Sequence, residues 1–111
     1  MKKSNINFTV ELDDSNVPEK ITWDADDKGS PGPSETKAIS IGLWDHFNQN
    51  TLRIDLWAKD MPMEEMKKFY VDCIGGLAQS ILSSTGDEYM AGEMNTLCDK
   101  LVQHLQQDNK S

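Results

Sequence analysis

The spacing of apolar residues changes once along the chain, at Pro62, and this change constrains the fold more than any other feature. Before Pro62, apolar and polar residues alternate in four short runs, which is typical of strands with one buried face. After Pro62, apolar residues recur every three or four positions as far as Leu105, which is typical of helices with one apolar stripe. Strands followed by helices predict an α+β domain in which the helices cover one face of the sheet.

The four alternating runs predict a four-stranded antiparallel sheet built from two hairpins. Their apolar positions are Ile6, Phe8, Val10 and Leu12, then Ile21, Trp23 and Ala25, then Ile39, Ile41 and Leu43, then Leu52, Ile54, Leu56 and Ala58. Turn-forming residues at 13–16 and a short connection at 46–50 join the runs in pairs. Between the two hairpins, residues 26–35 contain two glycines and two prolines, so we expect a flexible loop there.

The helical part predicts two amphipathic helices at the C-terminal end of a single domain, residues 1–111. Pro62 suits the first position of a helix, and Gly86 is a typical residue just beyond the end of one. Thr85 with Glu88 has the spacing of a capping box that would open the second helix. The closing residues 106–111 are expected to fray.

Gly75 and Gly76 interrupt the first predicted helix, where each glycine costs roughly 1 kcal/mol relative to alanine. Two explanations remain open for this pair. One is close packing against the sheet or the second helix, and the other is a kink at a binding groove.

The chain is acidic, with 11 Lys and Arg against 19 Asp and Glu and a net charge of −8. Such a field repels phosphate backbones and anionic lipid surfaces, so nucleic acid is not an expected partner. The first residues have no apolar core of a signal peptide, and no run approaches the ~20 apolar residues of a membrane span. Cys73 and Cys98 fall on apolar helix stripes, which is typical of free thiols. We therefore expect a cytoplasmic protein without membrane insertion.

A calcium loop and a zinc site are the metal sites that the sequence could offer, and both matches are poor. The residues at calcium-loop positions one, three, six and twelve are Asp24, Asp26, Gly29 and Glu35. Lys28 stands where a ligand belongs, and Pro31 interrupts the loop. The potential zinc ligands, which have neither a CxxC nor an HxxxH spacing, are His46, Cys73, Cys98 and His104. We expect no metal and no other cofactor, and a small calcium-binding, zinc-binding or ligand-binding domain is kept as the alternative function.

Catalytic motifs are also lacking, so we expect no enzymatic activity. The chain has no GxSxG elbow, and its only glycine pair lies inside a predicted helix rather than in a phosphate-binding loop. Neither cysteine has a neighbouring histidine or a cluster of positive charge in sequence that would lower its pKa. No catalytic residue is assigned.

The outward face of the second hairpin is the strongest candidate for a binding surface. If the alternating apolar residues face inward, Trp44, Arg53, Asp55 and Trp57 project from the opposite side. Tryptophan and arginine are the residues that most often anchor protein interfaces, which predicts a partner-binding or self-association face. A local explanation is also open, in which Trp57 covers Ser40 and Gly42 while Arg53 stacks on Trp44.

Several segments resemble the gliding-motility-associated GldC family of Bacteroidota. They are Leu43-Trp44-Asp45, the run from Asn50-Thr51-Leu52-Arg53-Ile54-Asp55-Leu56-Trp57 through Pro62, Glu65-Met66-Lys67-Lys68-Phe69, Val10-Glu11-Leu12-Asp13 and Val17-Pro18-Glu19-Lys20-Ile21-Thr22-Trp23. The resemblance implies a non-enzymatic accessory factor of gliding that binds a protein of the motility or envelope machinery. Because the family also occurs in bacteria not known to glide, the resemblance also allows gliding to be one setting of a broader housekeeping role.

Overall fold

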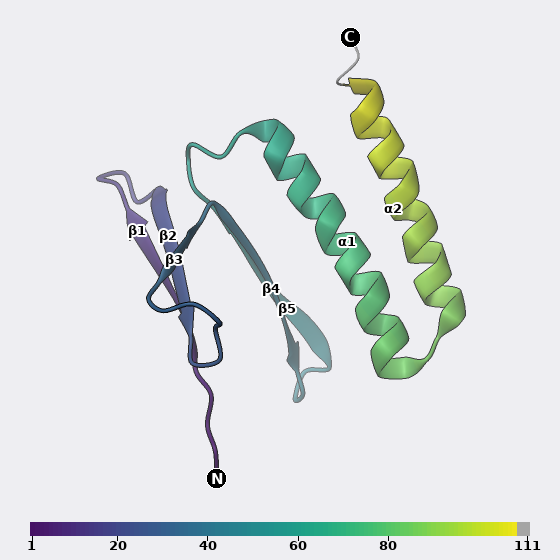
Figure 1. Ribbon diagram of the computed structural model, residues 1–111, viewed down its shortest axis with the longest axis horizontal. Coiled ribbons are helices and arrows are strands. Elements are labelled where there is room, and N and C mark those ends of the chain that lie inside the picture. The colour runs from purple at the N-terminus through teal and green to yellow at the C-terminus, as the bar shows by residue number, and fades with distance from the viewer. Residues whose placement is uncertain (109–111) are drawn as a thin grey trace. The chain divides into compact units, whose positions relative to one another are not determined.

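The computed structural model describes residues 1–108, which form five strands followed by two helices (Figure 1). The elements are β1 (Ile6–Leu12), β2 (Pro18–Ala25), β3 (Ser34–Thr36), β4 (Ala38–Asp45), β5 (Asn50–Trp57), α1 (Met63–Thr85) and α2 (Glu88–Asp108). The α+β class predicted from the change of periodicity is confirmed. The chain forms two compact units, a β unit (Met1–Met61) and a helical unit that begins at Pro62. A single domain with helices covering one sheet face stays a prediction.

The β unit contains two antiparallel sheets, β1-β2-β3 and β4-β5, so the prediction of one four-stranded sheet is wrong in this respect. The cause is the short strand β3, which pairs with β2 from Ile21↔Thr36 to Trp23↔Ser34. This strand occupies the edge of β2 at which a second hairpin would have continued the sheet. Its first two residues lie within the range that the sequence assigned to the loop 26–35. Three residues are too few to show the alternation that identifies a strand.

The predicted hairpins are both present, and a carboxylate orders each turn. Asp13 accepts hydrogen bonds from the backbone N–H groups of Ser15 (2.8 Å) and Val17 (3.1 Å) in the β1–β2 connection. Asp45 accepts bonds from the N–H groups of Phe47 (3.0 Å) and Asn48 (3.2 Å) in the β4–β5 connection. Short polar side chains therefore satisfy the turn backbone as their residue types predict.

The end of β5 is bonded to two other segments of the β unit. The N–H of Ala58 donates to the carbonyl of Lys37 (2.8 Å), and the N–H of Lys59 donates to the carbonyl of Pro18 (2.9 Å). The Lys59 ammonium also pairs with Asp13 (3.0 Å) and Glu19 (3.3 Å). These contacts fix the end of β5 beside the start of β2, and they determine the shape of the cleft described below.

Helices α1 and α2 lie side by side and pack against each other (Figure 1). Val71, Ala78 and Ala91 are buried. A Cβ placed on Gly75 would lie 3.6 Å from the Sγ of Cys98, so Gly75 permits close packing of α2 on α1. The close-packing explanation therefore holds for Gly75. Gly76 has no described side chain within 4 Å of such a Cβ, so it makes no comparable contact.

The junction between the helices differs from the predicted capping box. Gly86 adopts φ 75° and ends α1, as predicted, with its N–H donating to the carbonyl of Leu82 (2.9 Å). Asp87, and not Thr85, caps α2, because its Oδ1 accepts the N–H of Met90 (3.0 Å). The Thr85 hydroxyl instead donates to a carbonyl of α1 (2.6 Å). At its other end α2 extends to Asp108, and residues 109–111 lie outside the described residues, so fraying of 106–111 stays a prediction.

Candidate protein-binding face

The pairing of β4 with β5 brings the four predicted site residues to one face of a two-stranded sheet. The cross-strand pairs on this face are Ala38↔Trp57, Ser40↔Asp55, Gly42↔Arg53 and Trp44↔Thr51. Because side chains alternate along a strand, these residues share a side that excludes Leu43, Leu52 and Ile54. We call this surface the tryptophan face and define it by Trp44, Arg53, Asp55, Trp57, Ser40 and Gly42.

The two tryptophans lie at opposite ends of the tryptophan face. Trp44 is 62% exposed and Trp57 is 50% exposed. Trp44 pairs with Thr51, six positions before Trp57 on the same strand, so the two residues are separated by roughly 20 Å along the sheet at ~3.3 Å per residue. They are separate apolar contacts on one surface rather than a stacked pair.

A hydrogen-bonded polar cluster occupies the centre of the face. The Arg53 guanidinium bonds both carboxylate oxygens of Asp55, through Nη2 at 3.0 Å and Nε at 3.3 Å, and it also bonds the hydroxyl of Ser40. The Ser40 hydroxyl in turn donates to Asp55 (2.6 Å). These bonds from Arg53, and then from Ser40, hold the pKa of Asp55 below its ordinary value. Asp55 is therefore ionised at neutral pH and holds the guanidinium in place.

The space above Gly42 is filled by side chains from β5. A Cβ on Gly42 would lie 3.7 Å from Thr51 Cγ2 and 3.8 Å from Arg53 Nη1. Trp57 lies opposite Ala38, so the alternative in which Trp57 covers Gly42 is wrong. Stacking of Arg53 on Trp44 stays a prediction.

A cleft adjoins the tryptophan face at its Trp57 end. It has a volume of about 240 Å³ and is lined by Val17, Pro18, Asp55, Leu56, Trp57 and Lys59. Its walls come from the start of β2 and the end of β5, and the backbone bond from Lys59 to Pro18 holds them together. The sequence reasoning missed Val17 and Pro18, because the pairing of segments 40 residues apart leaves no local signal.

The candidate calcium loop is organised around its own lysine. The Lys28 ammonium donates to the carbonyl of Gly32, lies 3.8 Å from the Asp24 carboxylate and sits 5.1 Å from the ring centre of Trp23. The Asp26 carboxylate is directed elsewhere and accepts the N–H of Asn5 (2.9 Å). The four calcium-loop residues are therefore not brought together around a common point.

The candidate zinc ligands are also dispersed. Cys73 lies on α1, Cys98 and His104 lie on α2, and His46 lies in the β4–β5 turn beside Phe47; the two cysteines form no disulfide. Within residues 1–108, no group of three or more His, Cys, Asp or Glu residues could hold a metal ion. In the same part of the chain, neither helix is long and apolar enough to cross a membrane.

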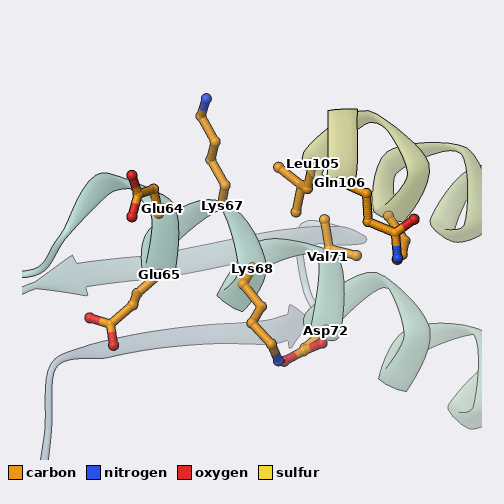
Figure 2. Close-up of a pocket in the computed structure, with 9 residues that line it drawn as sticks. Glu64, Glu65, Lys67, Lys68, Val71, Asp72, Leu105 and Gln106 are labelled. Atoms are coloured by element: carbon orange, nitrogen blue, oxygen red, sulfur yellow. The ribbon is translucent and has the colours of Figure 1, made fainter. Parts of the chain in front are cut away.

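A second hollow lies in the helical unit, between the first turns of α1 and the last turns of α2 (Figure 2). Its volume is about 380 Å³. Val71, Val102 and Leu105 give it apolar walls, and Glu64, Glu65, Lys67, Lys68, Asp72 and Gln106 surround them. Figure 2 shows the Lys68 and Asp72 side chains meeting at its edge, where they form an ion pair of 3.0 Å. The lining residues include no serine, cysteine or histidine.

The fold and these surfaces define a small acidic α+β protein with two exposed tryptophans on one side of its β4-β5 sheet. The chain belongs to the GldC-like family of gliding motility-associated proteins, whose family model matches residues 18–107. The matched range contains the whole tryptophan face, and the resemblance found in the sequence is confirmed. No protein of curated function and no solved structure is significantly similar to the chain.

Proposed function

We propose that this protein is a non-enzymatic accessory factor of gliding motility that binds a protein of the motility or envelope machinery through its tryptophan face. The observation that carries the proposal is the exposure of Trp44 and Trp57 on the same side of one small sheet. Each buried tryptophan removes ~150–250 Å² from water, and tryptophan and arginine dominate the energetic centres of interfaces. Membership of a gliding motility-associated family supports the choice of partner.

The centre of the face supports the same conclusion. Arg53 and Asp55 already bond each other and Ser40, so a partner does not have to order a mobile arginine when it binds. The net charge of −8 favours a protein partner over nucleic acid or an anionic membrane. We also propose that the interaction takes place in the cytoplasm, a reducing compartment in which cysteines without a disulfide, such as Cys73 and Cys98, are usual.

The proposal is tested by recovering partners of the tagged chain from its native cell. We expect a Trp44→Ala, Trp57→Ala double variant to lose the partner, since truncation of a tryptophan that anchors an interface costs ~2 kcal/mol or more. Tyr89→Ala is the matched control, because Tyr89 is 77% exposed on α2, outside the tryptophan face. Circular dichroism must show that both variants keep the native fold. Full recovery of the partner by the folded double variant would remove the tryptophan face from the interaction.

The mass of the purified protein in solution distinguishes self-association through the same face from binding of a different protein. The chain has a mass of 12.5 kDa, and light scattering on the purified protein measures whether one or two copies are present. We expect one copy when no partner is present. A stable dimer that the double variant converts to a monomer would show that the tryptophans meet a second copy instead.

A further inference from the structure

We propose that the cleft beside Trp57 receives a single apolar side chain of the partner, carried on a segment with basic residues on either side. This inference rests on the proposed function and adds the chemistry of the partner to it. The cleft is continuous with the tryptophan face, because Trp57 and Asp55 belong to both.

The size of the cleft selects the kind of ligand. Its volume of about 240 Å³ lies below the ~300–1,000 Å³ of typical small-molecule sites. Val17, Pro18, Leu56 and Trp57 supply apolar walls from the β1–β2 turn, the start of β2 and the end of β5. A leucine side chain is small enough to fit in this space, and its burial there would remove apolar surface from water on both molecules.

The charged groups of the cleft already have partners within the β unit. Asp55 accepts hydrogen bonds from Arg53 and Ser40, and Lys59 pairs with Asp13 and Glu19. Neither group therefore has to be paired by the inserted side chain. An apolar residue can enter without leaving a buried charge uncompensated, whereas a polar residue would lose its hydration with little return.

The surroundings of the cleft favour basic residues next to the inserted side chain. Three carboxylates, those of Asp13, Glu19 and Asp55, stand near two cations, Lys59 and Arg53. The wider β unit, residues 1–61, carries seven Lys and Arg against eleven Asp and Glu, a net charge of −4. This excess of negative charge attracts a basic segment and repels an acidic one, and the attraction weakens as salt is added.

Short peptides provide a direct probe on the unmodified protein. The probe is the acetylated and amidated pentapeptide Gly-Lys-Leu-Lys-Gly at millimolar concentration. The controls replace its leucine with serine or both of its lysines with glutamate. We expect the leucine peptide to shift the NMR signal of the Trp57 indole N–H, in a salt-dependent manner, while the Trp44 signal moves little. Equal responses to all three peptides, or no shift of Trp57, would overturn the inference.

A variant of the cleft distinguishes this inference from the proposed function. Val17→Ser removes one apolar wall, and we expect about a tenfold loss of affinity for the partner from the lost burial. The change leaves intact the backbone bonds of this turn, in which the N–H of Val17 donates to Asp13. The control is Phe47→Ser, since Phe47 is 93% exposed in the turn at the other end of the sheet.

The tryptophan double variant and Val17→Ser together distinguish failure of the cleft proposal from failure of the proposed function. Loss of the partner in the tryptophan double variant together with normal binding by Val17→Ser would leave the proposed function standing and refute the cleft. Partner binding that survives in the tryptophan double variant would refute the proposed function itself. A reduced affinity of Val17→Ser with an unchanged Phe47→Ser would support both.

Discussion

The two adjacent glycines of α1 allow a sharp test of how the helices pack. Gly75 faces Cys98 on α2, and a Cβ on Gly75 would meet its Sγ at 3.6 Å, an ordinary van der Waals distance. Gly76 has no described neighbour within 4 Å of its Cβ position. Alanine therefore fits at both positions. Since each glycine in a helix interior costs ~0.5–1 kcal/mol relative to alanine, we expect Gly75→Ala and Gly76→Ala each to raise the free energy of unfolding by about that amount.

Leucine is expected to separate the two positions. At Gly75 the longer side chain would extend into the space held by Cys98, whose thiol also donates to the carbonyl of Val71 (3.6 Å). Overpacking of this kind costs ~1–3 kcal/mol, which outweighs the gain in helix propensity. At Gly76 the side chain enters open space, so Gly76→Leu should remain within ~0.5 kcal/mol of Gly76→Ala.

Urea unfolding followed by circular dichroism at the helical band measures these differences. A change in the urea midpoint at constant m-value reports a change in the free energy of unfolding. In a parallel thermal melt, a change of 1 kcal/mol shifts the thermal midpoint of a domain of 60–100 residues by ~4–8 °C. Equal stability of Gly75→Leu and Gly76→Leu would refute close approach of the helices at Gly75. A loss of stability in Gly76→Ala would show that another surface covers Gly76.

Two further predictions concern the cap of α2 and the response to acid. Asp87→Ala should lower the free energy of unfolding by ~1 kcal/mol, because the N–H of Met90 loses its acceptor. Asp87→Asn keeps an acceptor and should change the free energy of unfolding little, and thermal melts of the two variants measure the difference. The pKa of Asp13 lies below its ordinary 3.8, mainly because its carboxylate accepts the N–H of Val17 and, second, because it pairs with Lys59. The ionised carboxylate therefore stabilises the folded protein fully above pH 3.8, and this contribution is lost as the pH falls through the lowered pKa. Urea unfolding at several pH values should therefore show a native protein more stable than Asp13→Asn near neutrality, with a difference that narrows in acid; a constant difference would contradict the linkage.

Local patterns in the sequence predicted most of the secondary structure. Alternation identified β1, β2, β4 and β5, and the three-and-four spacing identified α1 and α2, because both periods follow from backbone geometry within one element. The strand β3 was not predicted, since Ser34–Thr36 is short and polar and becomes a strand only by pairing with β2. Because β3 pairs with β2, the strands form two sheets instead of the single sheet that was predicted.

The candidate site was likewise predicted only in part. Trp44, Arg53, Asp55 and Trp57 could be placed on one face because the period of two fixes the side of each residue once a strand is identified. The bridging role of Ser40 depends on the register between β4 and β5, which the sequence left open. The cap at Asp87 was missed for a smaller reason, since Thr85 fits the same sequence rule two residues earlier.

By itself the sequence determined the class of the fold, the two hairpins followed by two helices, the negative charge, and that Trp44 and Trp57 share one side of their hairpin. These properties depend on neighbouring residues or on simple sums over the chain. Only the tertiary structure decided that the strands form two sheets, that Gly75 and not Gly76 packs against α2, and that Val17, Pro18 and Trp57 enclose a cleft. Each of these depends on contacts between residues far apart in the chain, whose register and distance leave no periodic trace in the sequence.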